Sequence, residues 1–173
     1  MALRQIRFQG DDILRKKAKE VKEITPKILE LLDDMKQTLV AKEAVGLAAT
    51  QVGMLRRIAI VDYDGEYYEL INPEVIETEG TQVSEEACLS VDGLCGDVTR
   101  PQKMVVRAID RTGQEFFVTA EDFLATIFSH EIDHLDGIMF TDKAENIRPM
   151  DDEEMKERKA RRRARRARRM EQA

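Results

Sequence analysis

The chain has only two histidines, His130 and His134, and Glu131 directly follows the first of them. Positions i and i+4 share one face of an α-helix, so both imidazoles can reach one metal ion if this stretch is helical. Apolar residues recur at helical spacing over 120–135, and Gly137 follows, which is typical of a helix end. We therefore predict a helix over 120–135 that carries a metal site; the alternative is a helix whose histidines only face solvent.

The H-E-x-x-H pattern does not by itself identify the third metal ligand. One candidate lies upstream, where residues 86–90 read Glu-Ala-Cys-Leu-Ser and contain Cys88. A thiolate and two imidazoles form a Cys-His₂ site with a fourth position open for water, although many free cysteines are simply small buried hydrophobic residues. The other candidates are acids downstream of the pair, as in zinc peptidases: Asp136, Asp142 and Glu145.

The remaining hydrophobic patterns predict an α+β fold in which antiparallel sheets partly wrap the motif helix. A first helix is expected over 24–42, where Thr25 and Pro26 form a typical helix start. The small residues of 44–53 predict a loop. Strands are expected over 57–63, 66–71, 73–80, 104–109 and 115–119, with a hairpin turn at Asp64 and Gly65.

Charge is separated along the chain. The formal net charge is −6, yet residues 156–169 hold ten Lys or Arg and a single Glu. Acids at 151–154 precede these bases, which is the order that a helix dipole favours. We therefore expect a metallohydrolase domain over 1–150 and a basic C-terminal helix or tail over 151–173. Such a tail can bind a polyanion, above all RNA; the alternative is a solvated helix without a partner.

Composition excludes several classes of protein. No apolar run approaches the ~20 residues that span a bilayer, and no signal sequence follows the first residues. Two cysteines are too few for a disulfide scaffold and indicate a cytoplasmic protein. Aromatic residues make up only 5% of the chain, which argues against a stacking platform for single-stranded nucleic acid.

Three motifs in order give the chain its resemblance to the peptide deformylases. That family has G-x-G-x-A-A-x-Q, then E-G-C-L-S, then H-E-x-x-H, and here the matching segments are 44–51, 86–90 and 130–134. The resemblance covers about residues 3–148. It implies that Cys88, His130 and His134 bind one divalent metal, with Fe(II) as the expected native ion and Zn, Ni or Co as alternatives.

The resemblance also implies an activity: hydrolytic removal of the N-formyl group from the N-terminal formylmethionine of newly made polypeptides, by a metal-bound hydroxide. Glu131 would move the water proton to the departing amine, and the Gln51 side chain and the Leu89 backbone N–H would stabilise the oxyanion. The methionine pocket would be lined by Val45, Gly46, Phe123 and Ile127, beside His130. The basic residues 156–169 would bind the ribosome, through its RNA, independently of the active site.

The chain departs from the family pattern at four positions, one of which is Ser129, where Gln is commonest. Ala44 and Ala87 replace glycines, so the loop beside the metal is expected to have a different shape. Cys95, expected as a free thiol, stands near the place where many members have an arginine that holds the peptide; Arg100 is a possible substitute.

Two other functions remain open at this stage. One is a different H-E-x-x-H metallohydrolase, peptidase-like, with an acidic third ligand. The other is a non-catalytic ribosome- or RNA-binding protein that keeps the metal for structure. A closed structural zinc site has four protein ligands, so this last function would need Cys95 as the fourth.

Overall fold

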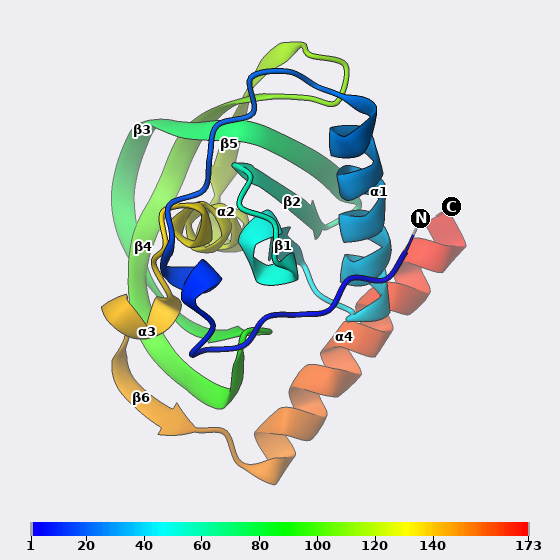
Figure 1. Cartoon of the computed structure of the whole chain (residues 1–173). Coiled ribbons are helices and arrows are strands. Elements are labelled where there is room, and N and C mark those ends of the chain that lie inside the picture. The colour runs from blue at the N-terminus through cyan, green and yellow to red at the C-terminus, as the bar shows by residue number, and fades with distance from the viewer. Residues whose placement is uncertain (1, 173) are drawn as a thin grey trace.

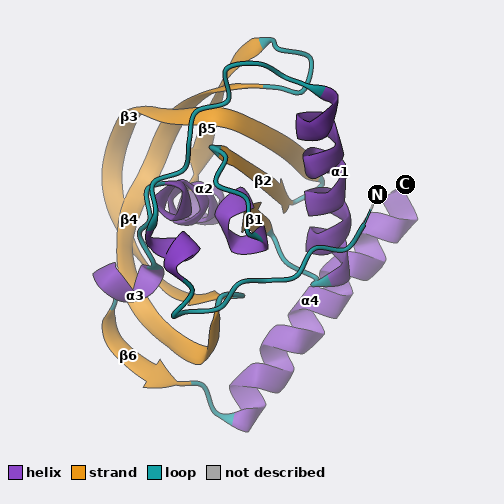
Figure 2. Ribbon diagram, viewed as in Figure 1, coloured by secondary structure: helices purple, strands orange, loops and turns teal. Residues whose placement is uncertain are grey.

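A curved antiparallel sheet surrounds one central helix in this protein (Figure 1, Figure 2). The computed structural model describes residues 2–172, apart from the side chains of residues 166, 169, 170 and 172. The central helix is α2 (Asp122–Leu135), which carries the H-E-x-x-H motif. The sheet has the strand order β1-β2-β3-β4-β5, and β6 also pairs with β4. The α+β architecture expected from the sequence is therefore confirmed.

Two long strands form most of the sheet. Strands β3 (Glu66–Cys88) and β4 (Val91–Ile109) pair antiparallel through a tight turn, and β5 (Glu115–Glu121) pairs with β4. The β3–β4 register shifts at three places, the last between Glu86 and Cys88. Such bulges increase local twist and bend a strand, which lets this ribbon curl around α2.

Strand β2 (Ile58–Tyr63) lies between two layers of the core. Ile58 and Ile60 pack in the cluster of α1 (Pro26–Ala41), whereas Ala59 and Val61 pack in the cluster of α2. Successive side chains of a strand point to opposite faces, so a strand that is buried on both faces is apolar throughout. The position of β2 therefore attaches α1 to the sheet that holds α2.

The expected helices are confirmed, and the expected loop over 44–53 is wrong. Thr25 is the N-cap of α1 with Pro26 following, and Gly137 ends the turn after α2 with a φ of 75°. Residues 44–53 instead contain β1 (Gly46–Ala48) and a short 3₁₀ helix, η2 (Ala49–Val52). Ala48 and Ala49 are fully buried, so these small residues allow close packing rather than flexibility.

Strand prediction also missed residues 81–88 and 91–103, which complete β3 and begin β4. Most side chains over 76–82 are exposed, so no alternation of apolar and polar residues identifies this part of β3. Main-chain pairing holds the segment as a strand. The β2–β3 hairpin was predicted correctly, and Asp64 and Gly65 both have positive φ in its turn.

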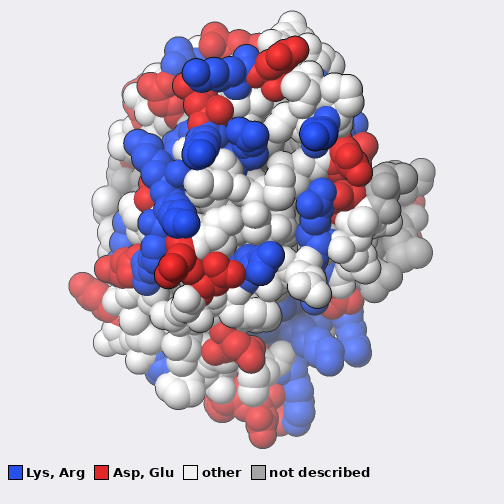
Figure 3. Space-filling model, in the orientation of Figure 1, with Lys and Arg blue, Asp and Glu red and all other residues white. Residues whose placement is uncertain are grey.

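The C-terminal segment returns across the molecule. A short 3₁₀ helix, η1 (Asp12–Arg15), lies near the N-terminus, and α3 (Phe140–Lys143), β6 (Glu145–Pro149) and α4 (Asp152–Gln172) follow the core. Helix α4 runs from β6 toward the C-terminal end of α1 (Figure 1). Lys and Arg side chains gather along it (Figure 3). In the described part of the chain, no helix is long and apolar enough to cross a membrane.

Candidate metal centre and substrate cleft

Three potential metal ligands converge where β3 meets α2. Cys88 is the last residue of β3, and His130 and His134 lie one turn apart on α2. The Cys88 Sγ is 3.3 Å from the His134 Nε2, which is 3.2 Å from the His130 Nε2. One ligand atom from each residue lies within 4.8 Å of the others. This donor set suits a divalent transition metal with one position left for water.

A buried ion pair orients the first histidine. The His130 Nδ1 is 2.8 Å from the Glu86 Oε2, and Arg100 donates to both oxygens of Glu86 at 2.7 and 2.9 Å. Metal-binding histidines commonly donate their second ring N–H to a carboxylate in this way. Arg100 is 3% exposed and also pairs with Asp133, so it serves this pair rather than holding a peptide.

The two buried carboxyl groups of the site, Glu86 and Glu131, have very different pKa values. Burial disfavours the ionised form of Glu86, but hydrogen bonds from Arg100 and His130 outweigh it and hold its pKa at about 2. For Glu131, burial dominates and raises the pKa to about 7. Burial lowers the pKa of His134, and a neutral imidazole has the lone pair that a metal ligand needs.

Glu131 occupies a tight space beside the ligands. Its side chain is buried, and its Oε2 has no hydrogen-bond partner among the described residues. A Cβ on Gly46 would lie 2.8 Å from the Glu131 Cγ and Cδ, and closer still to its Oε1. Gly46 therefore leaves the room that the carboxylate occupies. A buried carboxylate oxygen without a protein partner fits a site that receives a metal and its water.

The Gln51 side chain is fixed next to Cys88. Its Oε1 accepts from the Ala48 N–H at 2.9 Å, and its Nε2 donates to the Ser90 Oγ at 3.1 Å and the Cys88 Sγ at 3.4 Å. Leu89 follows Cys88 in the β3–β4 turn and lines the same cavity as Gln51. The structure thus brings the two residues expected to bind the oxyanion to one cavity beside the ligand cluster.

A cavity of about 370 Å³ opens beside the ligand cluster. The residues expected to bind methionine all line it: Val45, Gly46, Phe123 and Ile127. Ile127 is buried, while Phe123 is 37% exposed and packs edge-on against Tyr63. Segments far apart in the sequence therefore form one apolar wall.

Helix α4 also lines this cavity, which the sequence did not predict. Six residues of α4 line it: Glu154, Glu157, Arg158, Arg161, Arg162 and Arg165. The tail, which we expected to act separately from the active site, therefore contributes residues to the cavity beside the ligand cluster. Over residues 156–169 the only apolar residues are three alanines, so the sequence has no stripe of large apolar side chains that would predict a covered face.

The replaced glycines do not strain the backbone. Neither Ala44 nor Ala87 has a positive φ, so both accommodate a methyl group. The expected change in loop shape has no support from the backbone conformation of these two residues; Glu43, just before Ala44, has a positive φ of 55°.

Cys95 lies outside the ligand cluster. It is fully buried in β4 opposite Arg148 of β6, burial raises the pKa of its thiol, and both cysteines are free as expected. Among the described residues, the group that could hold a metal contains three members and not Cys95. The four-ligand structural site therefore has no support.

The downstream acids are also engaged elsewhere. Asp136 pairs with Arg57, and Asp142 pairs with Arg15. Glu145 lies exposed on β6. Within the described residues, none of these three acids joins the ligand cluster. A peptidase-like site with an acidic third ligand is therefore not favoured.

Comparison with known proteins agrees with this site. The family described as "Polypeptide deformylase" matches residues 3–150. The peptide deformylase of Thermoanaerobacter pseudethanolicus is 50% identical over 157 residues, which cover 91% of this chain and 98% of the relative. The peptide deformylase of Halothermothrix orenii is 53% identical over 149 residues, which cover 85% of this chain and 97% of the relative.

Solved structures show the same fold. The crystal structure of a peptide deformylase from Legionella pneumophila superposes with a TM-score of 0.81 at 38% identity, over 83% of this chain and 87% of that one. The peptide deformylase from Synechococcus elongatus in complex with actinonin superposes with a TM-score of 0.80 at 35% identity, over 83% of this chain and 79% of that one. With a family match over most of its length and relatives at half identity, the chain belongs to the peptide deformylase family.

Proposed function

We propose that Cys88, His130 and His134 hold a divalent metal, and that this centre carries the deformylase activity of the chain. The activity is hydrolysis of the N-formyl group from the N-terminal formylmethionine of newly made polypeptides. The observation that carries the proposal is the convergence of the three ligands beside Glu131, whose buried Oε2 has no hydrogen-bond partner in the described part of the chain. Fe(II) is the proposed native metal; the donor set also suits Zn, Ni or Co.

The residues around the ligands divide the chemistry among them. When bound, the metal supplies a Lewis acid that lowers the pKa of water toward neutrality. Glu131 accepts the proton of the attacking water and passes it to the departing amine as the amide C–N bond breaks and formate is released. The Gln51 amide and the Leu89 N–H donate to the formyl oxygen as negative charge develops on it.

The cavity positions the substrate. Val45, Phe123 and Ile127 provide apolar walls for the methionine side chain, and Gly46 leaves the space that the Glu131 side chain occupies beside them. Expelling water from such a pocket also strengthens the hydrogen bonds made by Gln51 and Leu89. The formyl group then lies toward the ligand cluster, and the following residues lie toward the mouth of the cavity.

Metal content and formate release test this function together. Protein purified without oxygen should contain one metal per chain and release formate from a formyl-Met peptide. Cys88→Ser and His134→Ala should lose the metal. Glu131→Gln should keep it but lose about 10²–10⁴-fold in turnover, because a positioned acid–base group is removed.

The exposed Glu121→Gln serves as the control and should change neither metal content nor turnover. Full metal occupancy in Cys88→Ser would show that the ligand assignment is wrong. Normal turnover in Glu131→Gln would remove this residue from the mechanism.

We also propose that residues 151–173 form a separate functional segment from the metallohydrolase domain 1–150, and that it binds the ribosome through RNA. Support comes from the bases that lie away from the cavity on α4: Lys156, Lys159 and Arg163 are all exposed. Guanidinium and ammonium groups on one open face suit a phosphate backbone. The two unpaired cysteines support a cytoplasmic setting.

A further inference from the structure

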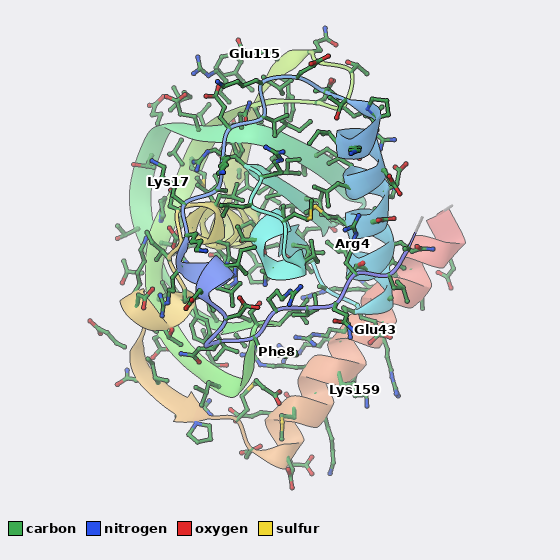
Figure 4. All side chains as sticks on the ribbon, in the orientation of Figure 1. Arg4, Phe8, Lys17, Glu43, Glu115 and Lys159 are labelled. Carbon is green, nitrogen blue, oxygen red and sulfur yellow. The ribbon has the colours of Figure 1, made fainter. Side chains whose placement is uncertain are left out.

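The face of α4 that meets the cavity is built from arginines. Arg158, Arg162 and Arg165 are half-buried at helical spacing and line the cavity, whereas Arg163, between them in sequence, is exposed. Figure 4 places Glu43, just after α1, next to α4, the helix that carries Lys159. Glu43 lines the cavity together with these arginines.

Ion pairs attach α4 to the rim of the cavity. Arg158 pairs with Glu85 at 2.6 Å, three residues before the ligand Cys88. Arg148 bridges Glu85 and Glu154 at 2.9 and 2.5 Å, which ties β3 to the start of α4. On the other rim, the guanidinium of Arg165 lies 6.0 Å from the centre of the Phe123 ring, a distance at which a cation–π interaction is favourable.

Arg162 differs from Arg158 and Arg161 because it makes no ion pair with any described residue. Glu85 and Glu154 are already paired, and Glu157 lies 3.6 Å from Arg161. Within the described residues, no hydrogen bond or ion pair reaches the Arg162 guanidinium, although the charges of Glu43 and Cys88 act on it across the cavity. Burial lowers its pKa, and Arg158 adds to this effect, but an arginine stays protonated at neutral pH.

A half-buried guanidinium without a partner favours an anionic ligand. It has five N–H donors in a planar fork, which match the two oxygens of a carboxylate. Arg162 lines the same cavity as Phe123 and Ile127, so a peptide whose methionine lies there brings its next residues toward α4. A carboxylate within the first residues after methionine would therefore meet this arginine.

We propose that Arg162 is a specificity-determining residue that binds the side-chain carboxylate of an Asp or Glu close behind the formylmethionine. The inference rests on the proposed deformylase function and names a substrate class for it. Chains that begin with formylmethionine and an early acidic residue are then bound more tightly than neutral ones.

Matched peptides test this preference with the full-length, metal-loaded protein. The peptides are C-terminally amidated formyl-Met peptides with Asp at the second or third position, each with an Asn counterpart. A hydrogen bond to a charged group contributes about 1.5–3 kcal/mol, so kcat/KM for the better Asp peptide should exceed that of its Asn counterpart by about 10–150-fold. The gain should appear in KM rather than kcat, and should decrease with salt.

Variants of α4 assign the effect to one side chain. Arg162→Gln should remove the preference while retaining turnover of the Asn peptides, and Arg162→Lys should keep only part of it, because the ammonium lacks the planar fork. Arg163→Gln, on the exposed face one residue further, should leave the kcat/KM of every one of these peptides unchanged, because Arg163 does not line the cavity. Circular dichroism checks that each variant is folded.

Several results would overturn the proposal. Equal kcat/KM for Asp and Asn peptides would do so, as would a preference that persists in Arg162→Gln. If only peptides with a free C-terminal carboxylate depend on Arg162, the ligand is a chain end and the proposed side-chain specificity is wrong. If no formyl peptide is hydrolysed, the deformylase function fails instead; calorimetric binding of the deformylated Met-Asp and Met-Asn peptides then still decides whether Arg162 recognises the carboxylate.

Discussion

Single residues determine how closely the catalytic groups approach one another. Gly46 is required because its backbone lies against the Glu131 side chain, and the Glu86–Arg100 pair is required because it orients His130. Both contacts join residues that are far apart in sequence. Substitution at either contact should affect the position of a reacting group as well as the stability of the chain.

Replacing Gly46 by alanine tests the first of these contacts. The added Cβ would overlap Glu131, so we expect a loss of about 1–3 kcal/mol in the free energy of unfolding and a larger loss of turnover than of stability. Urea unfolding and formate release measure the two effects. Glu131→Asp in the same chain shortens the side chain and should recover stability but not turnover; stability unchanged by Gly46→Ala alone would contradict the contact.

Among the elements, α1 holds the N-terminal segment as well as the core. Asp34 is buried on α1 and accepts from the Ala2 N–H at 2.5 Å and from the Arg4 Nε at 2.9 Å. Thr38, one turn later, accepts from the Arg4 N–H at 2.9 Å. One buried carboxylate and one hydroxyl thus attach a segment that has no regular secondary structure of its own.

This attachment should depend on pH through Asp34. Burial favours the protonated form, but the hydrogen bonds from Ala2 and Arg4 outweigh it and lower the pKa. Because the folded pKa lies below the unfolded one, ionised Asp34 stabilises the fold above about pH 4, and this stability is lost as pH falls through the folded pKa. Asp34→Asn should lower the free energy of unfolding by about 1–3 kcal/mol at pH 7. Below about pH 4, the difference in stability between the variant and the unchanged protein should become smaller.

Thermal or urea unfolding of both proteins across this pH range measures the effect. The neighbouring Asp33→Asn is the control: Asp33 forms an exposed ion pair with Arg111, so its loss should change stability by less than about 0.5 kcal/mol at any pH. A stability difference for Asp34→Asn that is constant with pH would show that the carboxylate charge is not involved.

Over the whole molecule, charge is divided between an acidic body and a basic helix, and that helix has two faces. The inner face lines the cavity, and the outer face carries Lys156, Lys159 and Arg163. Deleting residues 156–173 would remove both faces at once, so it would change the substrate cavity as well as any contact with RNA. Only a change confined to the outer face separates the two proposed roles.

Replacing Lys156, Lys159 and Arg163 together by glutamine should weaken ribosome association at low salt by about tenfold or more, because each lost phosphate contact removes counterion release. Turnover of short formyl-Met peptides should stay within about twofold, since these residues do not line the cavity. Cosedimentation with ribosomes at low and high salt measures the first effect. If the triple variant and the unchanged protein pellet equally, the outer face is not the binding surface.

The sequence alone was sufficient for the parts of this protein that depend on local pattern. The i, i+4 spacing of His130 and His134 required a helix, apolar periodicity located α1 and α2, and the Asp64–Gly65 turn marked the β2–β3 hairpin. Three ordered motifs indicated the family. In each case the information lies within a short window, where backbone geometry and side-chain spacing determine the outcome.

Tertiary structure decided what depends on contacts between distant segments. Only the fold shows that Arg100 is paired with Glu86 and that Cys95 lies outside the ligand cluster. It also shows that the polar end of β3 is a strand because it pairs with β4. Only the fold also places Arg162 in the substrate cavity. A charged helix has the same local pattern in solvent or over a cleft, so the difference lies in the ion pairs that it makes with the rest of the chain.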